Sequence, residues 1–206
     1  MKKIKVMVAD DHSIVRMGLT ALLEAERDMQ VVGEAEDGEQ AVAMALKALP
    51  DVIVMDLMMP VKDGIDATRE IHQLLPQVKI LVLTTSGSSD DIASAIKAGA
   101  AGALLKSSSN DRLIAAIRHI ADGKMCISDE VREMIDEDPP IETLTARQQE
   151  ILCSITRGLT NLDIAKQLGI REDSVKEHVN NIFLKIGAAN RAEAVAIALR
   201  KHLLKF

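Results

Sequence analysis

Over its first 121 residues the chain alternates short runs of β-branched and aliphatic residues with longer stretches of helical periodicity. The short runs have the length of buried strands, and Gly or Asp-Gly turns fall between the elements. Five strand-then-helix units in succession are typical of an α/β domain with a parallel sheet and helices on both faces. The predicted strands cover residues 4–9, 30–35, 52–55, 80–83 and 103–105, and the predicted helices cover 13–24, 40–49, 65–75, 91–98 and 111–121.

The alternation stops in an acidic stretch that ends in two prolines, Pro139 and Pro140. The diproline disfavours a continuing helix, and the surplus of negative charge favours a solvated segment. Beyond it only helical patterns occur, over residues 146–157, 161–168, 171–186 and 191–204. A chain of 206 residues suffices for two small domains. The sequence therefore predicts an α/β domain over 1–124, an acidic linker over 125–141 and a small all-α domain over 142–206.

Charge is distributed unevenly between these parts, although the net charge of the whole chain is −6. Residues 128–140 contain one basic and six acidic residues, whereas residues 141–206 contain ten basic and seven acidic residues. A surplus of positive charge attracts polyanions such as nucleic acid. The C-terminal part is therefore the part of the chain that could bind DNA.

Acidic side chains stand where two of the predicted strands end. Asp10 and Asp11 follow the first strand, and Asp56 follows the third. In a flavodoxin-like strand order, 2-1-3-4-5, these two strand ends are neighbours at the point where the order reverses, which is where ligands bind in open α/β sheets. Three carboxylates repel one another unless a cation lies between them, and Mg²⁺ prefers such oxygen ligands. We expect a magnesium site here.

A hydroxyl and an ammonium group reach the same edge of the predicted sheet. Thr84 follows the fourth strand and Lys106 follows the fifth. Together with a metal they could surround a phosphoryl group that Asp56 accepts as a nucleophile. Each of these residues could alternatively cap a strand or a helix, but the arrival of all five at strand ends favours a phosphoryl site.

The motifs around these residues resemble the receiver domain of two-component response regulators, over about the first 120 residues. The resemblance implies that a sensor histidine kinase phosphorylates Asp56, and that Thr84 and Lys106 sense the phosphoryl group. It further implies that Mg²⁺ is bound by Asp11, Asp56 and the carbonyl of Met58, with support from Asp10. The motifs are Ala9-Asp10-Asp11-His12, Met55-Asp56-Leu57-Met58-Met59-Pro60 with Gly64, Leu83-Thr84-Thr85-Ser86, and Ala98-Gly99-Ala100 with Leu105-Lys106.

Ala103 departs from the receiver pattern. Receivers often carry an aromatic residue three positions before the lysine, and that ring turns inward when the domain is phosphorylated. A methyl group cannot do this. We expect the signal to travel instead through Thr84 and the following loop, or through direct dimerisation of the receiver.

Residues 158–186 have the helix-turn-helix spacing, with a turn at Gly169. On a helical wheel, the second helix has one apolar stripe, and Lys176, Glu177 and Asn180 point away from it. These side chains can read base edges in a major groove: Asn binds adenine, Lys binds guanine or phosphate, and Glu accepts from cytosine. A small helical packing domain with a solvated outer face is the alternative. The apolar stripe consists of Val175, Val179, Ile182 and Ile186.

The C-terminal part also resembles the LuxR-type helix-turn-helix of NarL/FixJ-type regulators, over nearly all of residues 143–200. The resemblance implies dimeric binding to paired half-sites of double-stranded DNA, with the helix over residues 192–199 as the dimer contact, where Ala194, Ala196 and Ala198 would leave room for close approach. His178 either contacts phosphate or is structural. The residues that carry the resemblance are Leu144-Thr145, Arg147, Gly158, Asn161, Ile164-Ala165, Leu168, Val175-Lys176, His178-Val179, Asn181-Ile182, Lys185, Arg191 and Ala194. Among them Asn161, Lys185 and Arg191 join the DNA-binding candidates.

These features favour a cytoplasmic, non-enzymatic DNA-binding regulator. Every apolar run is much shorter than the ~20 residues that span a bilayer, so we expect no membrane segment. One alternative is an aspartyl-phosphate hydrolase that uses Asp56, but the sequence offers no phosphate-binding Gly-rich loop and no separate general base. The other is a LuxR-type regulator that acts largely independently of phosphorylation.

Overall fold

The computed structural model describes residues 3–85, 89–137, 140, 144–201 and 203. The chain divides into two compact units, Met1–Pro139 and Pro140–Phe206. Among the described residues, no helix combines the length and the apolar character that crossing a membrane requires.

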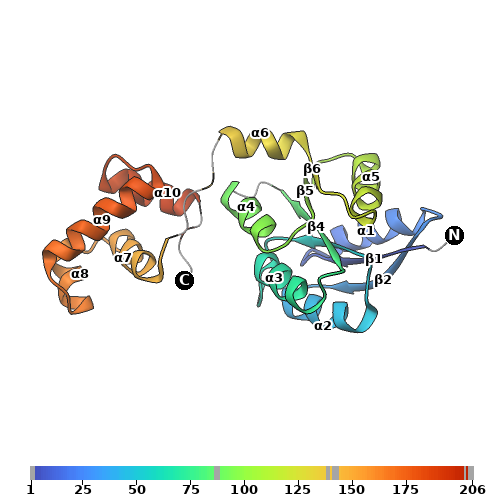
Figure 1. Cartoon of the computed structure of the whole chain (residues 1–206), viewed down its shortest axis with the longest axis horizontal. Coiled ribbons are helices and arrows are strands. Elements are labelled where there is room, and N and C mark those ends of the chain that lie inside the picture. The colour runs from blue at the N-terminus through green and yellow to red at the C-terminus, as the bar shows by residue number, and fades with distance from the viewer. Residues whose placement is uncertain (1–2, 86–88, 138–139, 141–143, 202, 204–206) are drawn as a thin grey trace. The chain divides into compact units, whose positions relative to one another are not determined.

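The N-terminal unit is a parallel sheet in the order β2-β1-β3-β4-β5-β6 with helices on both faces (Figure 1). Its first five strands have the predicted flavodoxin-like order, so the predicted fold class is confirmed. In chain order the elements are β1 (Ile4–Ala9), α1 (Ser13–Glu24), β2 (Met29–Ala35), α2 (Gly38–Ala48), β3 (Val52–Asp56), α3 (Gly64–Leu74), β4 (Lys79–Thr84), α4 (Ser89–Lys97), β5 (Gly102–Leu105), α5 (Asn110–Ala121), β6 (Cys126–Ile127) and α6 (Asp129–Glu137).

The strands bury both faces because successive side chains point to opposite sides of the sheet. In β1, Val6 and Val8 belong to the apolar cluster that includes residues of α1 and α5, whereas Met7 and Ala9 belong to the cluster that includes residues of α2, α3 and α4. This two-sided burial explains why the strands are almost uniformly apolar in sequence. In the central strands β3 and β4 it leaves polar residues only at the strand ends, and Asp56 and Thr84 thus lie at the same edge of the sheet.

The prediction of a linker over residues 125–141 is wrong for most of that range. Residues 126–127 extend the sheet as β6, with main-chain hydrogen bonds from Cys126 to Ala101 and from Ser128 to Ala103. Residues 129–137 form α6, which packs on β5 and α4. Its Val131 is fully buried in the core, and Met134 and Ile135 are partly buried against the same cluster. An apolar stripe inside an acidic segment therefore makes it part of the N-terminal unit.

The C-terminal unit contains α7 (Ala146–Thr156), α8 (Asn161–Leu168), α9 (Glu172–Ile186) and α10 (Arg191–Arg200), in agreement with the all-α prediction. The helices α7, α8 and α10 begin at side-chain caps: Thr145, Thr160 and Asn190 each accept a hydrogen bond from the main chain three residues later. Gly169 and Gly187 end α8 and α9 with positive φ angles of 63° and 71°, a conformation that glycine adopts at low cost. All four helices contribute to one apolar core.

Candidate functional site

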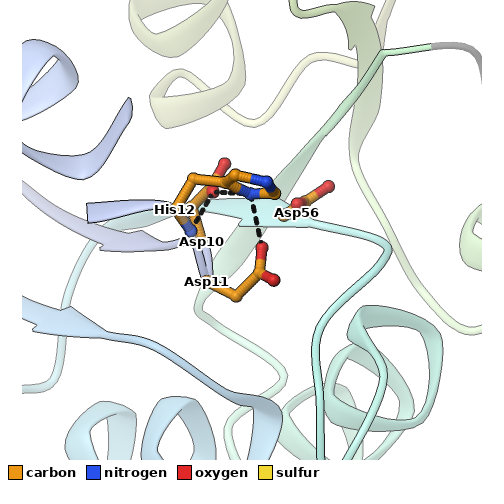
Figure 2. A group of neighbouring side chains, drawn as sticks. All are labelled: Asp10, Asp11, His12 and Asp56. Carbon is orange, nitrogen blue, oxygen red and sulfur yellow. Dashed lines mark hydrogen bonds and ion pairs between the residues drawn. The ribbon is translucent and has the colours of Figure 1, made fainter. Parts of the chain in front are cut away.

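The predicted acidic residues gather at the carboxyl edge of the sheet. Asp56 is the last residue of β3, Asp10 follows β1 directly, and both are buried, with 5% and 1% of their surface exposed. One carboxylate oxygen from each of Asp10, Asp11 and Asp56, together with a ring nitrogen of His12, lie within 4.8 Å of one another (Figure 2). The strand order alone brings Asp10 and Asp56 together, because β1 and β3 are neighbours.

Lys106 joins two of these carboxylates. Its Nζ lies 2.6 Å from Oδ2 of Asp10 and 2.7 Å from Oδ2 of Asp56. The main-chain amide of Lys106 donates to the carbonyl of Thr84 at 2.7 Å, so the ends of β4 and β5 are fixed to each other beside the site. Thr84 is buried. All the residues predicted for the phosphoryl site thus share one edge of the sheet.

Burial governs the electrostatics of this edge. It raises the pKa of Asp56 above the usual range of an aspartate, and the ammonium group of Lys106 opposes that shift. Burial also disfavours the charge of Lys106, but the hydrogen bonds to Asp10 and Asp56 outweigh it, so the pKa of Lys106 is raised. With Asp11 included, three carboxylates face one ammonium group, and the excess negative charge fits a divalent cation. Hard oxygen ligands of this kind suit Mg²⁺.

Two residues to which the sequence analysis gave no role, His12 and Arg16, also lie at this edge. The Nδ1 atom of His12 lies 2.7 Å from Oδ1 of Asp11 and 3.3 Å from Oδ1 of Asp10, as the dashed lines in Figure 2 show. Arg16 donates from its guanidinium group to the carbonyl of Asp10 at 2.7 Å. The position of His12 directly after the two acids was a usable signal. The sequence carried no comparable signal for Arg16.

In the C-terminal unit, the predicted apolar stripe of α9 is confirmed. Val175, Val179, Ile182 and Ile186 are its buried residues. Lys176, Glu177 and Asn180 are exposed on the other side, where they could enter a groove of DNA. His178 and Lys185 are half-buried at the margin of that face.

The comparisons with known proteins cover both units. Residues 6–118 match the response regulator receiver domain, and residues 142–198 match the LuxR family of bacterial regulatory proteins. The chain is 41% identical to the transcriptional regulatory protein LiaR of Bacillus subtilis over 209 residues, which cover 98% of this chain and 99% of LiaR. It is 36% identical to a nitrate/nitrite response regulator protein homolog of Haemophilus influenzae over 204 residues, which cover 97% and 98% of the two chains.

The chain belongs to the response regulator family, with a receiver domain and a LuxR-type DNA-binding domain.

Solved structures agree with this assignment. The regulator resembles ChrA, the response regulator of a heme-sensing two-component system, at 36% identity with a TM-score of 0.60, covering 99% of this chain and 100% of ChrA. It also resembles RcsB of Salmonella enterica serovar Typhimurium, solved bound to a promoter in the presence of the phosphomimetic BeF3−, at 25% identity with a TM-score of 0.73. That match covers 95% of this chain and 98% of RcsB. By their names, LiaR is a transcriptional regulatory protein, RcsB was solved bound to a promoter, and the other two are response regulators; none of the four is named as an enzyme.

Two of the predicted DNA-binding residues bind each other inside the C-terminal domain of the regulator. The guanidinium group of Arg191 lies 3.5 Å from Oδ1 of Asn161 and also donates to the carbonyl of Leu159. These contacts fasten the start of α8 to the start of α10. Asn161 and Arg191 therefore act first as a structural link between helices.

The prediction that three alanines of the last helix leave room for a dimer partner is wrong for two of them. Ala194 and Ala198 are fully buried in the core of their own domain, because they face α7 and α9. Ala196 is exposed, as is Leu199, whose surface is 57% accessible. Any partner must use this other side of α10.

Proposed function

We propose that a sensor histidine kinase phosphorylates the regulator on Asp56 and that this controls its binding to double-stranded DNA. The observation that carries the proposal is the contact of Lys106 with both Asp10 and Asp56 beside Asp11 at the carboxyl edge of the sheet. A lysine that bridges two buried carboxylates is already placed where a phosphoryl oxygen would arrive. The names of the relatives support control of transcription as the output.

The residues at this edge have separate roles in the transfer. A carboxylate oxygen of Asp56 attacks the phosphorus, the bond to the donor breaks, and an acyl phosphate forms. Lys106 exchanges its contact with Asp56 for one with a phosphoryl oxygen, and the hydroxyl of Thr84 donates to another. Asp11, Asp56 and the main-chain carbonyl of Met58 would hold Mg²⁺, with Asp10 in support, and the ion would neutralise charge on the transferring group.

The output surface in this proposal is the exposed side of α9. Asn180 and Glu177 would read base edges with Lys176, while His178 and Lys185 would lie close to phosphates. We further propose that the regulator works in the cytoplasm, where the DNA is, and binds paired half-sites as a homodimer. Its contact would be the exposed side of α10, and the receiver would provide a second contact.

Intact mass spectrometry after incubation with a small phosphodonor and Mg²⁺ tests the first step. One hydroxylamine-labile phosphoryl adduct is expected, and no adduct would contradict the proposal. Free phosphate released continuously from a separate substrate would instead favour an aspartyl-phosphate hydrolase.

A DNA titration with and without the phosphodonor tests the output. Equal affinity in both states would favour a LuxR-type regulator that acts independently of phosphorylation.

A further inference from the structure

The exposed lysine of α9 is held by two acids of its own helix. The Nζ atom of Lys176 lies 3.3 Å from Oε1 of Glu172 and 3.4 Å from Oδ1 of Asp173, at spacings of four and three residues. Hydrogen bonds to these two carboxylates raise the pKa of Lys176. The lysine is thus charged but already has two anionic partners.

The two acids do not serve as ordinary helix caps. In α8, Asp163 accepts a hydrogen bond from the main chain of Thr160 and so completes a capping box. In α9 the cap residue is Arg171, which makes no side-chain capping bond, and Glu172 and Asp173 turn to Lys176. The helix dipole stabilises acidic side chains in the first turn of a helix, but that effect requires no contact with a lysine.

This arrangement matters for DNA binding because phosphate contacts supply most of the affinity that is independent of sequence. The first two turns of α9 carry three acids, Glu172, Asp173 and Glu177, and one lysine, Lys176. The start of α9, which would contact DNA, therefore carries a net negative charge. A lysine that remained with its acids would add little attraction for phosphates of arbitrary DNA.

We propose that Glu172 and Asp173 are positioning residues, which hold Lys176 as a reader of base edges and keep it away from phosphates. The inference rests on the proposed DNA binding through α9. In a matching site, a guanine edge offers Lys176 two acceptors in a fixed place. On arbitrary DNA, the lysine stays with the two carboxylates, so sequence-independent binding is weak.

The expected size of the effect follows from counterion release. Freeing one lysine to contact one phosphate makes the slope of log affinity against log salt steeper by about 0.9. At 0.1 M salt this corresponds to an affinity for arbitrary DNA that is about eightfold higher. If the acids act by holding Lys176, the gain in affinity must disappear when Lys176 is also replaced. A gain that came only from weaker charge repulsion would remain without Lys176.

The experiment is a double-mutant cycle in the full-length protein, treated with phosphodonor and Mg²⁺. A duplex selected from a random-sequence pool is compared with a scrambled duplex between 50 mM and 200 mM salt. The Glu172→Gln/Asp173→Asn variant should bind the scrambled duplex about eightfold more tightly at 0.1 M salt, with a slope steeper by about 0.9. Adding Lys176→Gln should remove this gain. Lys176→Gln alone should leave scrambled binding and its slope unchanged, and weaken the selected duplex at one base pair.

The matched control is Glu150→Gln. Glu150 pairs with Arg147 at 2.7 Å on α7, with the same three-residue spacing, away from the exposed face of α9. It should leave the slope unchanged. If the double variant folds poorly, Asp173→Asn alone replaces it, because that side chain is 77% exposed; about a threefold gain is then expected, half of the eightfold effect on a logarithmic scale.

Two results would overturn this inference and leave the proposed function intact. One is a gain in affinity for the scrambled duplex that persists without Lys176. The other is a less steep salt dependence on the scrambled duplex when Lys176→Gln is made in the wild type. The first would mean that the acids act only through general charge, and the second that the lysine already contacts phosphate. Wild-type protein that binds neither duplex would overturn the proposed function, and this inference with it.

Discussion

Helix α6 should open separately from the rest of the receiver when its one fully buried side chain is shortened. Val131 is 0% exposed and lies in the same apolar cluster as Ile92 of α4 and Ala103 of β5. Val131→Ala removes two methyl groups, which is about 1.6 kcal/mol of transfer free energy at ~0.8 kcal/mol per carbon. The cavity left behind brings the cost to about 2 kcal/mol. At ~1.4 kcal/mol per decade, the opening constant of α6 should rise about 30-fold.

Native-state hydrogen exchange measures this opening directly. Because Val131→Ala should lower the free energy of opening α6 by about 2 kcal/mol, the main-chain amides of residues 133–137 should exchange about 30-fold faster in this variant. The amides of β3 should keep their protection. The control is Glu130→Gln, which breaks the exposed ion pair with Arg112 and should accelerate exchange in α6 less than about fivefold.

A uniform loss of protection across the receiver would refute this reasoning. In that case α6 would unfold only with the whole domain, and Val131 would be an ordinary core residue. Unchanged exchange in Val131→Ala would mean that the partly buried Met134 and Ile135 hold the helix without it.

Three further substitutions test the two sites. Asp56→Asn should abolish the phosphoryl adduct in intact mass spectra without lowering the thermal midpoint, because the amide is nearly isosteric but a poor nucleophile; undiminished labelling would remove Asp56 from its role. Asn180→Ala should cost ~1–3 kcal/mol at one base pair of each half-site, measured against duplexes changed one position at a time, and an equal loss on all duplexes would place the wrong face in the groove. Ala103→Tyr should change the effect of phosphorylation on DNA affinity more than it changes phosphoryl uptake, because Ala103 is fully buried and a ring there must displace its neighbours. In the wild type we expect that effect to stay below about a hundredfold, or ~2.7 kcal/mol, and a thousandfold response unaltered by Tyr would contradict us.

The sequence by itself determined the sheet, the edge where the acidic residues gather and the buried face of α9. These depend on local periodicity and on simple topological rules. The flavodoxin-like order that we expected for five strand-then-helix units is the observed one, and in this order β1 and β3 are neighbours, so the ends that carry Asp10 and Asp56 meet. The four-residue and three-residue spacing from Val175 to Ile186 likewise leaves only one face of α9 to be buried.

Only the tertiary structure decided three things: the packing of α6, the burial of the alanines of α10, and the contacts of Lys106 with Asp10 and Asp56. Acidic composition predicted a solvated linker. The spacing of Val131, Met134 and Ile135 was a local sign of an apolar helix face, but only the folded unit shows that this face packs on β5 and α4. Ala194 and Ala198 are small enough for either a partner or their own core, and the packing of α10 on α7 and α9 selects the core. The contacts of Lys106 with Asp10 and Asp56 join residues 96 and 50 positions apart along the chain, and such long-range pairings depend on the folded sheet because sequence separation carries no information about distance.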